Sequence, residues 1–248
     1  MKDRNKESPE TALSEHGFVA GISQELRRPL TVLLGYLEML LPQAEDETAQ
    51  ALKHMHVQAR QIQAMLDDLL ELSGIAETKE AEHDQFVDVP AIVTQLKEQA
   101  EELSSGHHEL EFRIDSELHL KGNARNIESA FRNLIVNAVR YTPSGGTIQV
   151  TWDMSGSGAE FVVEDNGIGI AAEDIPRLTR RFFRAESDPV RNTEGAGLGL
   201  SIVRQVVEAH QANLHIESEP GKGSRFSCTF PDERLLENSF RVAQAAGK

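Results

Sequence analysis

The sequence is poor in the residues that mark several common protein classes. Cys228 is its only cysteine, so no disulfide can form within the chain, and no CxxC or histidine-rich spacing suggests a zinc site. Lys and Arg number 25 against 40 Asp and Glu, and the net charge of −15 argues against nucleic acid or an anionic membrane surface as a partner. A reducing compartment is expected.

Long apolar runs are also missing. No segment has the roughly 18 apolar residues of a membrane-spanning helix, and the opening MKDRNKESPE is too polar for a secretory signal. We therefore expect a cytoplasmic chain, bound to a membrane only if a further N-terminal segment of a longer protein supplies the anchor. Ordinary globular composition, with 39% hydrophobic and 26% charged residues, predicts a folded body.

Two long helical patterns occupy the first third of the chain. Apolar residues recur at three- or four-residue steps from Thr11 to Leu41, and again from Asp46 to about Ser73. Pro29 is expected to bend the first helix, Pro42 to end it, and Gly74 to end the second. Because a lone hairpin cannot enclose this apolar stripe, two copies are expected to form a four-helix bundle. An intramolecular three-helix packing is the alternative.

The predicted domains are a helical hairpin over residues 11–75, a linker over 76–85, a second domain over 86–231 and a polar tail over 232–248. Sequence patterns in the second domain predict helices over 90–104, 123–141 and 200–210, and strands over 86–89, 109–114, 147–152, 160–164, 213–218 and 224–230. This order predicts an α+β fold, with a sheet that carries its helices on one face.

The first polar block in the second domain is NLIVNAVRYT. Asn133 and Asn137 lie one helical turn apart on the same face, and Arg140 and Tyr141 follow. Asn137 can offer a carbonyl oxygen to Mg²⁺, which prefers oxygen ligands. Arg140 can meet a phosphate, and Tyr141 can cover a base or sugar. Taken alone, the block is better explained by a capped, solvated helix.

The second block, EDNGIGI, places Asp165 after a strand and before Gly167 and Gly169. Glycines let the backbone approach a ligand closely, and a carboxylate accepts hydrogen bonds from an exocyclic amine such as that of adenine. An ordinary DNG turn is the alternative.

The third block, EGAGLGLSIV, sets Gly195, Gly197 and Gly199 before a helix. Free backbone amides and the helix dipole there favour an anion, which predicts a phosphate site.

A long segment without a clear pattern, residues 171–194, separates the second block from the third. Such a segment is typical of a functional lid. We expect Arg184 to bring a charge to a terminal phosphate, with Phe182 and Phe183 as the anchors that seat the lid.

In this order the blocks resemble the ATP-binding domain of the sensor histidine kinases of two-component systems. NLIVNAVRYT resembles the N box, DNGIGI the G1 box, RRFFR the F box and GAGLGL the G2 box. The N-terminal FVAGISQELRRPLTVLLGYLEML is similar to the H box, and the similarity is greatest to the phosphate-regulon members of the family. The resemblance covers roughly residues 16–231.

The resemblance implies a dimerisation and histidine-phosphotransfer hairpin, followed by an α/β sandwich of the Bergerat ATP-binding kind. It implies ATP and Mg²⁺ as ligands, with Asn137 on the metal, and a response-regulator receiver domain as partner. The implied nucleotide-binding residues are Asn133, Asn137, Arg140, Tyr141, Asp165, Gly167, Gly169, Phe182, Gly195, Gly197, Leu198 and Gly199.

The H-box-like segment departs from the family at two positions. Gln24 stands where the family has the phosphoacceptor histidine, and an amide has almost no nucleophilic nitrogen. Glu25, by resemblance the general base, is present. Arg28 stands where phosphatase-active members carry Thr or Asn, and it has no acceptor to orient a water. His16 lacks the Glu and Pro context of the acceptor, so we do not expect it to substitute.

These observations favour a histidine-kinase core with an intact ATP site and no acceptor. Autophosphorylation is then expected to be lost, Arg28 puts phosphatase activity in question, and whether the chain is an enzyme stays open. A second hypothesis is a non-catalytic ATP-binding dimeric scaffold that sequesters a response regulator. A third, an ATPase of the chaperone or mismatch-repair type, fits the glycine blocks but not the hairpin.

Overall fold

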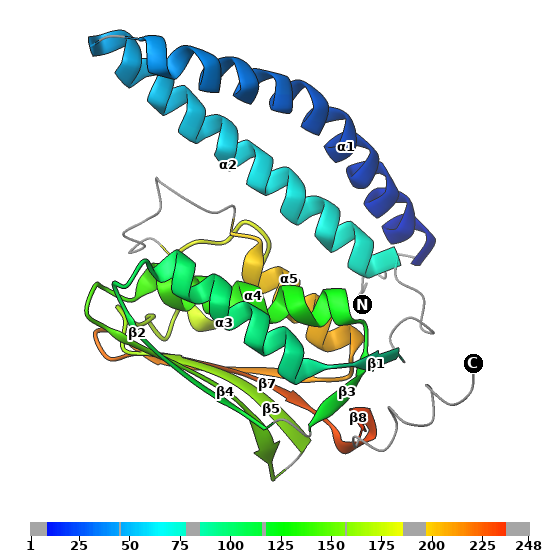
Figure 1. Cartoon of the computed structure of the whole chain (residues 1–248). Helices are drawn as coiled ribbons and strands as arrows, with labels where there is room; N and C mark the ends of the chain where they lie inside the picture. Colours follow the sequence, from blue (N-terminus) through cyan, green and yellow to red (C-terminus); the bar gives the residue numbers. More distant parts are fainter. Residues whose placement is uncertain are drawn as a thin grey trace. The chain divides into compact units, whose positions relative to one another are not determined.

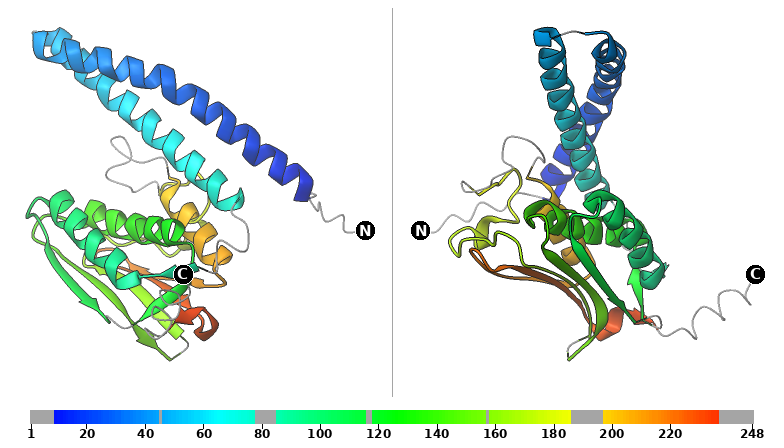
Figure 2. Two further views of the ribbon diagram at one scale, coloured as in Figure 1. Left: turned by 45° about the vertical axis from the view of Figure 1, so that its right-hand side comes forward. Right: turned by 60° about the vertical axis from the view of Figure 1, so that its left-hand side comes forward.

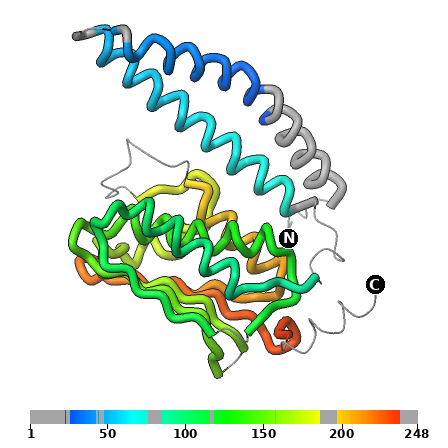
Figure 3. Tube along the Cα trace, viewed as in Figure 1, coloured from blue at the N-terminus to red at the C-terminus, as the bar shows by residue number. Residues whose placement is uncertain are grey.

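The computed structural model describes residues 9–44, 46–77, 85–115, 118–156, 158–185 and 197–236. They divide into two compact units, one built on an N-terminal helical hairpin and one on an α/β body (Figure 1). Figure 3 follows the backbone through both. Within the described ranges, no helix combines the length and the apolar character needed to cross a bilayer.

The first unit is an antiparallel pair of helices, α1 (Pro9–Leu40) and α2 (Asp46–Glu77), joined through the short 3-10 helix η1 (Leu41–Gln43). The helices share a small core because their apolar residues recur on one face. The buried side chains of this core are Leu30, Leu34, Leu37, Ala59 and Leu66.

Proline and glycine act on the two helices in different ways. α1 passes through Pro29 and ends at Leu40, before Pro42, as predicted. The prediction that Gly74 ends the second helix is wrong, because α2 continues to Glu77. A single glycine costs a helix only about 1 kcal/mol, and the next residue, Ile75, is buried, which favours continuation.

The second unit combines a five-stranded sheet, in the order β2-β4-β5-β7-β6, with a small sheet in the order β1-β3-β8. In the large sheet β2 and β4 are parallel and the other neighbours antiparallel. The elements are β1 (Gln85–Val87), α3 (Val89–Ser104), β2 (Glu109–Ile114), β3 (His119–Gly122), α4 (Ala124–Tyr141), β4 (Thr147–Ser155), β5 (Gly158–Asp165), η3 (Ile175–Arg177), α5 (Gly199–Ala209), β6 (Asn213–Glu219), β7 (Gly223–Phe230), η4 (Asp232–Arg234) and β8 (Leu235–Leu236).

Helices α3, α4 and α5 cover one face of the large sheet (Figure 2), which confirms the predicted α+β sandwich. Alternation in β4 explains this, since Ile148, Val150 and Trp152 are fully buried while the residues between them face outward. Phe131 of α4 stacks on Phe161 of β5, with 3.6 Å between ring centroids. These contacts hold α4 across the middle of the sheet.

Two strands were absent from the sequence-based prediction. β3 pairs with both β1 and β8 in antiparallel register. In the pairing with β8, Leu120 faces Leu235 and His119 faces Leu236. Ordered chain therefore extends beyond residue 231, where the polar tail was predicted to begin. The rest of that tail, from residue 237, and most of the predicted linker, residues 78–84, lie outside the described residues.

Candidate functional site

A buried carboxylate ends the central strand of the large sheet. Asp165 is the last residue of β5, is 8% exposed, and lies between Ile148 of β4 and Ser224 of β7. Its Oδ1 accepts the Gly167 N–H at 2.8 Å. Burial raises the pKa of Asp165, hydrogen bonds from the Gly167 and Ser224 backbone oppose that rise, and the charge of Glu164 adds to it. A carboxylate kept in such a place costs stability, which favours a ligand-binding role over a simple turn.

The turn after Asp165 packs on the C-terminal end of α4. Ile168 N–H donates to the Tyr141 carbonyl at 3.1 Å, and a Cβ on Gly167 would lie only 2.4 Å from that same oxygen. On its other side the Ile168 carbonyl accepts from Gly221 N at 2.8 Å. Gly169 adopts a positive φ of 67°, which glycine allows without strain. The glycines of the second block therefore serve close backbone packing.

Gly167→Ala is expected to destabilise the chain by about 2 kcal/mol, because the added methyl meets a backbone carbonyl that cannot move alone. The matched control is Gly156→Ala, since a Cβ at Gly156 meets no atom within 4 Å. Urea unfolding of both variants tests this. Equal midpoints for the two variants would show that the turn does not need to touch α4.

A second contact joins α4 to the third block. Gly199 is the first residue of α5, and a Cβ there would lie 2.6 Å from Asn133 Oδ1. The Asn133 amide is held in place because its Nδ2 donates to the Ser129 carbonyl at 3.0 Å. Asn133 therefore faces the N-terminus of α5, the end of a helix that favours an anion.

The remaining residues of the first block follow along the same helix. Asn137, Arg140 and Tyr141 are all half-buried. In the third block, Gly197 has a positive φ of 72° and Leu198 is fully buried, whereas Gly195 lies outside the described residues.

In the predicted lid, the two phenylalanines differ. Phe182 is 60% exposed and has a positive φ of 63°, so its side chain is not packed as an anchor. Phe183 is half-buried, and the Arg177 guanidinium lies 4.4 Å from the centre of its ring. Arg184 is half-buried directly after it. The described part of the lid ends at residue 185.

On the hairpin, Gln24 and Glu25 lie in α1, and their side chains are outside the described part of the structure. Arg28 is exposed. The preceding residue, Arg27, forms an ion pair with Asp67 of α2 and so links the two helices next to Arg28.

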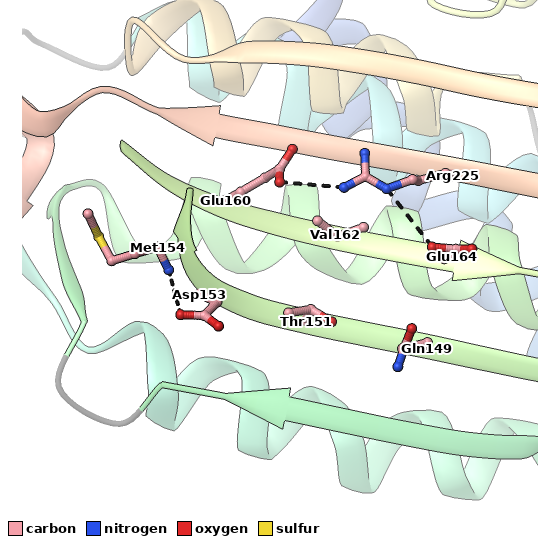
Figure 4. A pocket seen from close by; sticks show the side chains of 8 residues that line it. All are labelled: Gln149, Thr151, Asp153, Met154, Glu160, Val162, Glu164 and Arg225. Atoms are coloured by element: carbon pink, nitrogen blue, oxygen red, sulfur yellow. Dashed lines mark hydrogen bonds and ion pairs between the residues drawn. The ribbon is translucent and has the colours of Figure 1, made fainter. Parts of the chain in front are cut away.

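A polar groove of about 250 Å³ lies on the outer face of the sheet, away from the helices (Figure 4). At one side of the groove, Arg225 of β7 lies within 4.0 Å of Glu160, Glu164 and Glu217. Three carboxylates thus neutralise this cation, so the groove is no phosphate site. The lining residues are Gln149, Thr151, Asp153, Met154, Glu160, Val162, Glu164 and Arg225.

Two polar residues that the sequence did not single out hold the Asp165 turn. Asn166 Oδ1 accepts from Thr147 N at 2.8 Å, and Ser218 Oγ accepts from Ile170 N at 2.8 Å. An asparagine within a turn is a recognisable signal for Asn166. Ser218 carried no signal, because its role depends on a neighbouring strand.

Comparison with known proteins agrees with this arrangement. A family model for histidine kinase-, DNA gyrase B- and HSP90-like ATPases matches residues 122–234, and one for the His Kinase A (phospho-acceptor) domain matches residues 14–78. The phosphate regulon sensor protein PhoR of Pseudomonas aeruginosa is 42% identical over 224 residues, which are 89% of this chain and 51% of that protein.

Sensor-like histidine kinase SenX3 of Mycobacterium tuberculosis is 34% identical over 218 residues, 86% of this chain and 53% of that protein. The solved structure of full-length ShkA in complex with AMPPNP has the same fold, with a TM-score of 0.68 at 21% identity over 89% of this chain and 46% of that one. The chain spans about half the length of the curated relatives. With both domains present in this order, the chain belongs to the sensor histidine kinases of two-component systems.

Proposed function

We propose that the chain is a histidine-kinase-like core that binds ATP with Mg²⁺ and engages a response regulator, but does not phosphorylate itself because Gln24 occupies the acceptor position. The proposed nucleotide site rests on one observation: α4, which holds the first polar block, contacts both the Asp165 turn of the second block and the start of α5 in the third. Tyr141 receives the Asp165 turn, and Asn133 faces the start of α5.

These contacts suggest how the nucleotide lies. The Asp165 carboxylate accepts from the exocyclic amine of adenine, and the backbone amides at the start of α5 receive phosphate oxygens. Asn133 and Arg140 serve the phosphates as further donors. The half-buried Asn137 fits Mg²⁺ through its carbonyl oxygen, since Mg²⁺ is bound by few protein oxygens together with substrate phosphates. When bound, the ion neutralises phosphate charge.

The proposed loss of transfer rests on the chemistry of residue 24. A kinase hairpin needs a nucleophile there, and the glutamine amide nitrogen is delocalised into its carbonyl. The test is incubation of the unmodified chain with γ-labelled ATP and Mg²⁺, followed by acid treatment. No acid-labile label is expected. Acid-labile label would mean that another histidine accepts the phosphoryl group and that the proposal for Gln24 is wrong.

Exposed apolar side chains on the hairpin support a homodimer. A single chain leaves many of them in water, whereas two hairpins packed as a four-helix bundle bury them. These residues are Leu26, Val32, Leu33, Tyr36, Met39, Leu40, Met55, Val57, Ile62 and Met65.

The exposed Arg28 is the proposed contact to an acidic receiver domain. Arg28→Asp is expected to weaken binding to the receiver domain that partners the Pseudomonas aeruginosa relative by about tenfold, because it reverses a charge at the interface. Lys53→Asp, at an exposed position of α2, is the control. Surface plasmon resonance gives both affinities, and equal affinities would count against Arg28 as a contact.

ATP and receiver domains are found in the cytoplasm, so the proposal places the chain there, alone or as part of a longer receptor. A non-catalytic dimeric scaffold that sequesters a regulator is the second candidate, and Gln24 together with Arg28 favours it. An ATPase of the chaperone or mismatch-repair type does not account for the His Kinase A match at residues 14–78.

A further inference from the structure

A histidine outside the predicted site contacts the C-terminal end of α4. His108 lies between α3 and β2, with Nε2 2.9 Å from the Thr142 carbonyl and Nδ1 3.0 Å from Ser104 Oγ. A carbonyl can only accept, so Nε2 carries the proton and donates it. Nδ1 of the neutral ring then accepts from the Ser104 hydroxyl, which itself accepts the His108 N–H at 3.1 Å.

Residues next to His108 bond to the turn that follows Thr142. The His107 carbonyl accepts from Gly145 N at 2.7 Å, and Glu109 N–H donates to the Gly146 carbonyl at 2.9 Å. Ser104, to which both histidines bond, is only 2% exposed. The segment from α3 to β2 is therefore fastened to the turn that follows α4 by bonds at both ends of that turn.

That turn adjoins the proposed nucleotide site. The last carbonyls of a helix have no partner within the helix. Here the carbonyl of Tyr141, the last residue of α4, and that of its C-cap Thr142 are taken by separate segments. Tyr141 O accepts from Ile168 N in the Asp165 turn, and Thr142 O accepts from His108. The end of α4 is thus held between the two segments.

We propose that His108 is a positioning residue for the nucleotide site. By holding the Thr142 carbonyl, it sets the orientation of the last turn of α4, and with it the Tyr141 carbonyl that receives the Asp165 turn. This inference rests on the proposed ATP-binding function. Within the described residues, the hydrogen bonds of His108 go to Ser104 and Thr142, so its effect on the Asp165 turn is transmitted through Thr142.

A purely structural bond and a positioning bond differ in what they change. A structural bond alters the free energy of unfolding, and the folded fraction still binds nucleotide normally. A positioning bond alters affinity in a fully folded chain and loosens the Ile168 amide. His108→Gln separates these further, because the glutamine Nε2 reaches about as far as the histidine Nε2 and can donate to Thr142.

The experiment is calorimetric titration with Mg·AMPPNP, together with hydrogen exchange at the Ile168 amide, at a temperature where every variant is folded by circular dichroism. His108→Ala is expected to bind about fivefold more weakly, the loss of roughly one hydrogen bond, and to exchange faster at Ile168. His108→Gln is expected to recover most of both. Val93→Ala, a fully buried position in α3, is the control and is expected to lower stability but not affinity.

Unchanged affinity and unchanged Ile168 exchange in His108→Ala would overturn the inference, as would an equal affinity loss in Val93→Ala. If the unmodified chain binds no nucleotide, the proposed function fails instead. The Ile168 exchange rate then still decides whether His108 positions the turn.

Discussion

The Gln24→His variant is expected to phosphorylate itself when given Mg²⁺ and γ-labelled ATP. The substitution restores an imidazole, which is nucleophilic near neutral pH, beside Glu25 as the general base. The change lies in α1 of the hairpin, so the sequence of the ATP domain is untouched. Label on the variant should exceed that on the unmodified chain at least about 100-fold, and acid should remove it because phosphohistidine is acid-labile.

A second new histidine on the same hairpin controls for position. Gln58 is exposed on α2, so Gln58→His adds the same side chain without the Glu25 and Pro29 context. It is expected to stay unlabelled. An unlabelled Gln24→His variant, or equal label on both variants, would show that residue 24 is not the acceptor position.

Asp165→Asn is expected to weaken Mg·AMPPNP binding about 100-fold while leaving the fold intact. The asparagine oxygen can still accept the Gly167 N–H that Oδ1 accepts at 2.8 Å. The second oxygen, however, becomes an NH₂ group, which opposes the exocyclic amine with another donor. Two donors then face each other without an acceptor, and a charge-assisted hydrogen bond is lost.

The pKa of Asp165 makes a further prediction about stability. Because burial raises the pKa of this carboxyl in the folded chain above its unfolded value, the folded chain holds the proton more tightly. The contribution of the Asp165 carboxyl to folding stability is therefore present at low pH and is lost as pH rises through its pKa in the folded chain. At neutral pH Asp165→Asn should thus unfold at a urea concentration equal to or above that of the unmodified chain.

Acidification is expected to weaken nucleotide binding by the unmodified chain, starting at a pH above the ordinary aspartate range, since protonated Asp165 loses its charge. Asp153→Asn, at an exposed position on the outer face of β4, is the control for both measurements. Affinity of Asp165→Asn within twofold of the unmodified chain would remove Asp165 from the adenine contact.

Most of the fold followed from periodicity. The two long helices and the strands of the large sheet have strong patterns of three to four or of two residues, and these patterns report the face that is buried. β3 and β8 have four and two residues. Strands so short exist because distant partners pair with them, which no local pattern records.

The sequence predicted those parts of the site whose residues lie close together along the chain. It did not predict contacts between residues that are far apart in sequence. Asp165 and Gly167 stand two residues apart in one turn. Their spacing therefore predicted that the backbone of this turn comes close to another group. The contact of Asn133 with Gly199 and the bond from His108 to Thr142 join residues far apart in sequence. Phe182 is exposed and Phe183 is half-buried. Because the two residues are identical and adjacent, the sequence alone could not show which of them packs.

We propose that α4, the Asp165 turn and the start of α5 form one nucleotide site, and this proposal underlies the others. It is tested most directly by titrating the unmodified chain with Mg·AMPPNP while recording backbone amide resonances. Saturation at one nucleotide per chain is expected, with the largest shifts at Gly167, Ile168 and Gly199. Absence of saturable binding, or shifts centred on Arg225 in the outer groove, would contradict it.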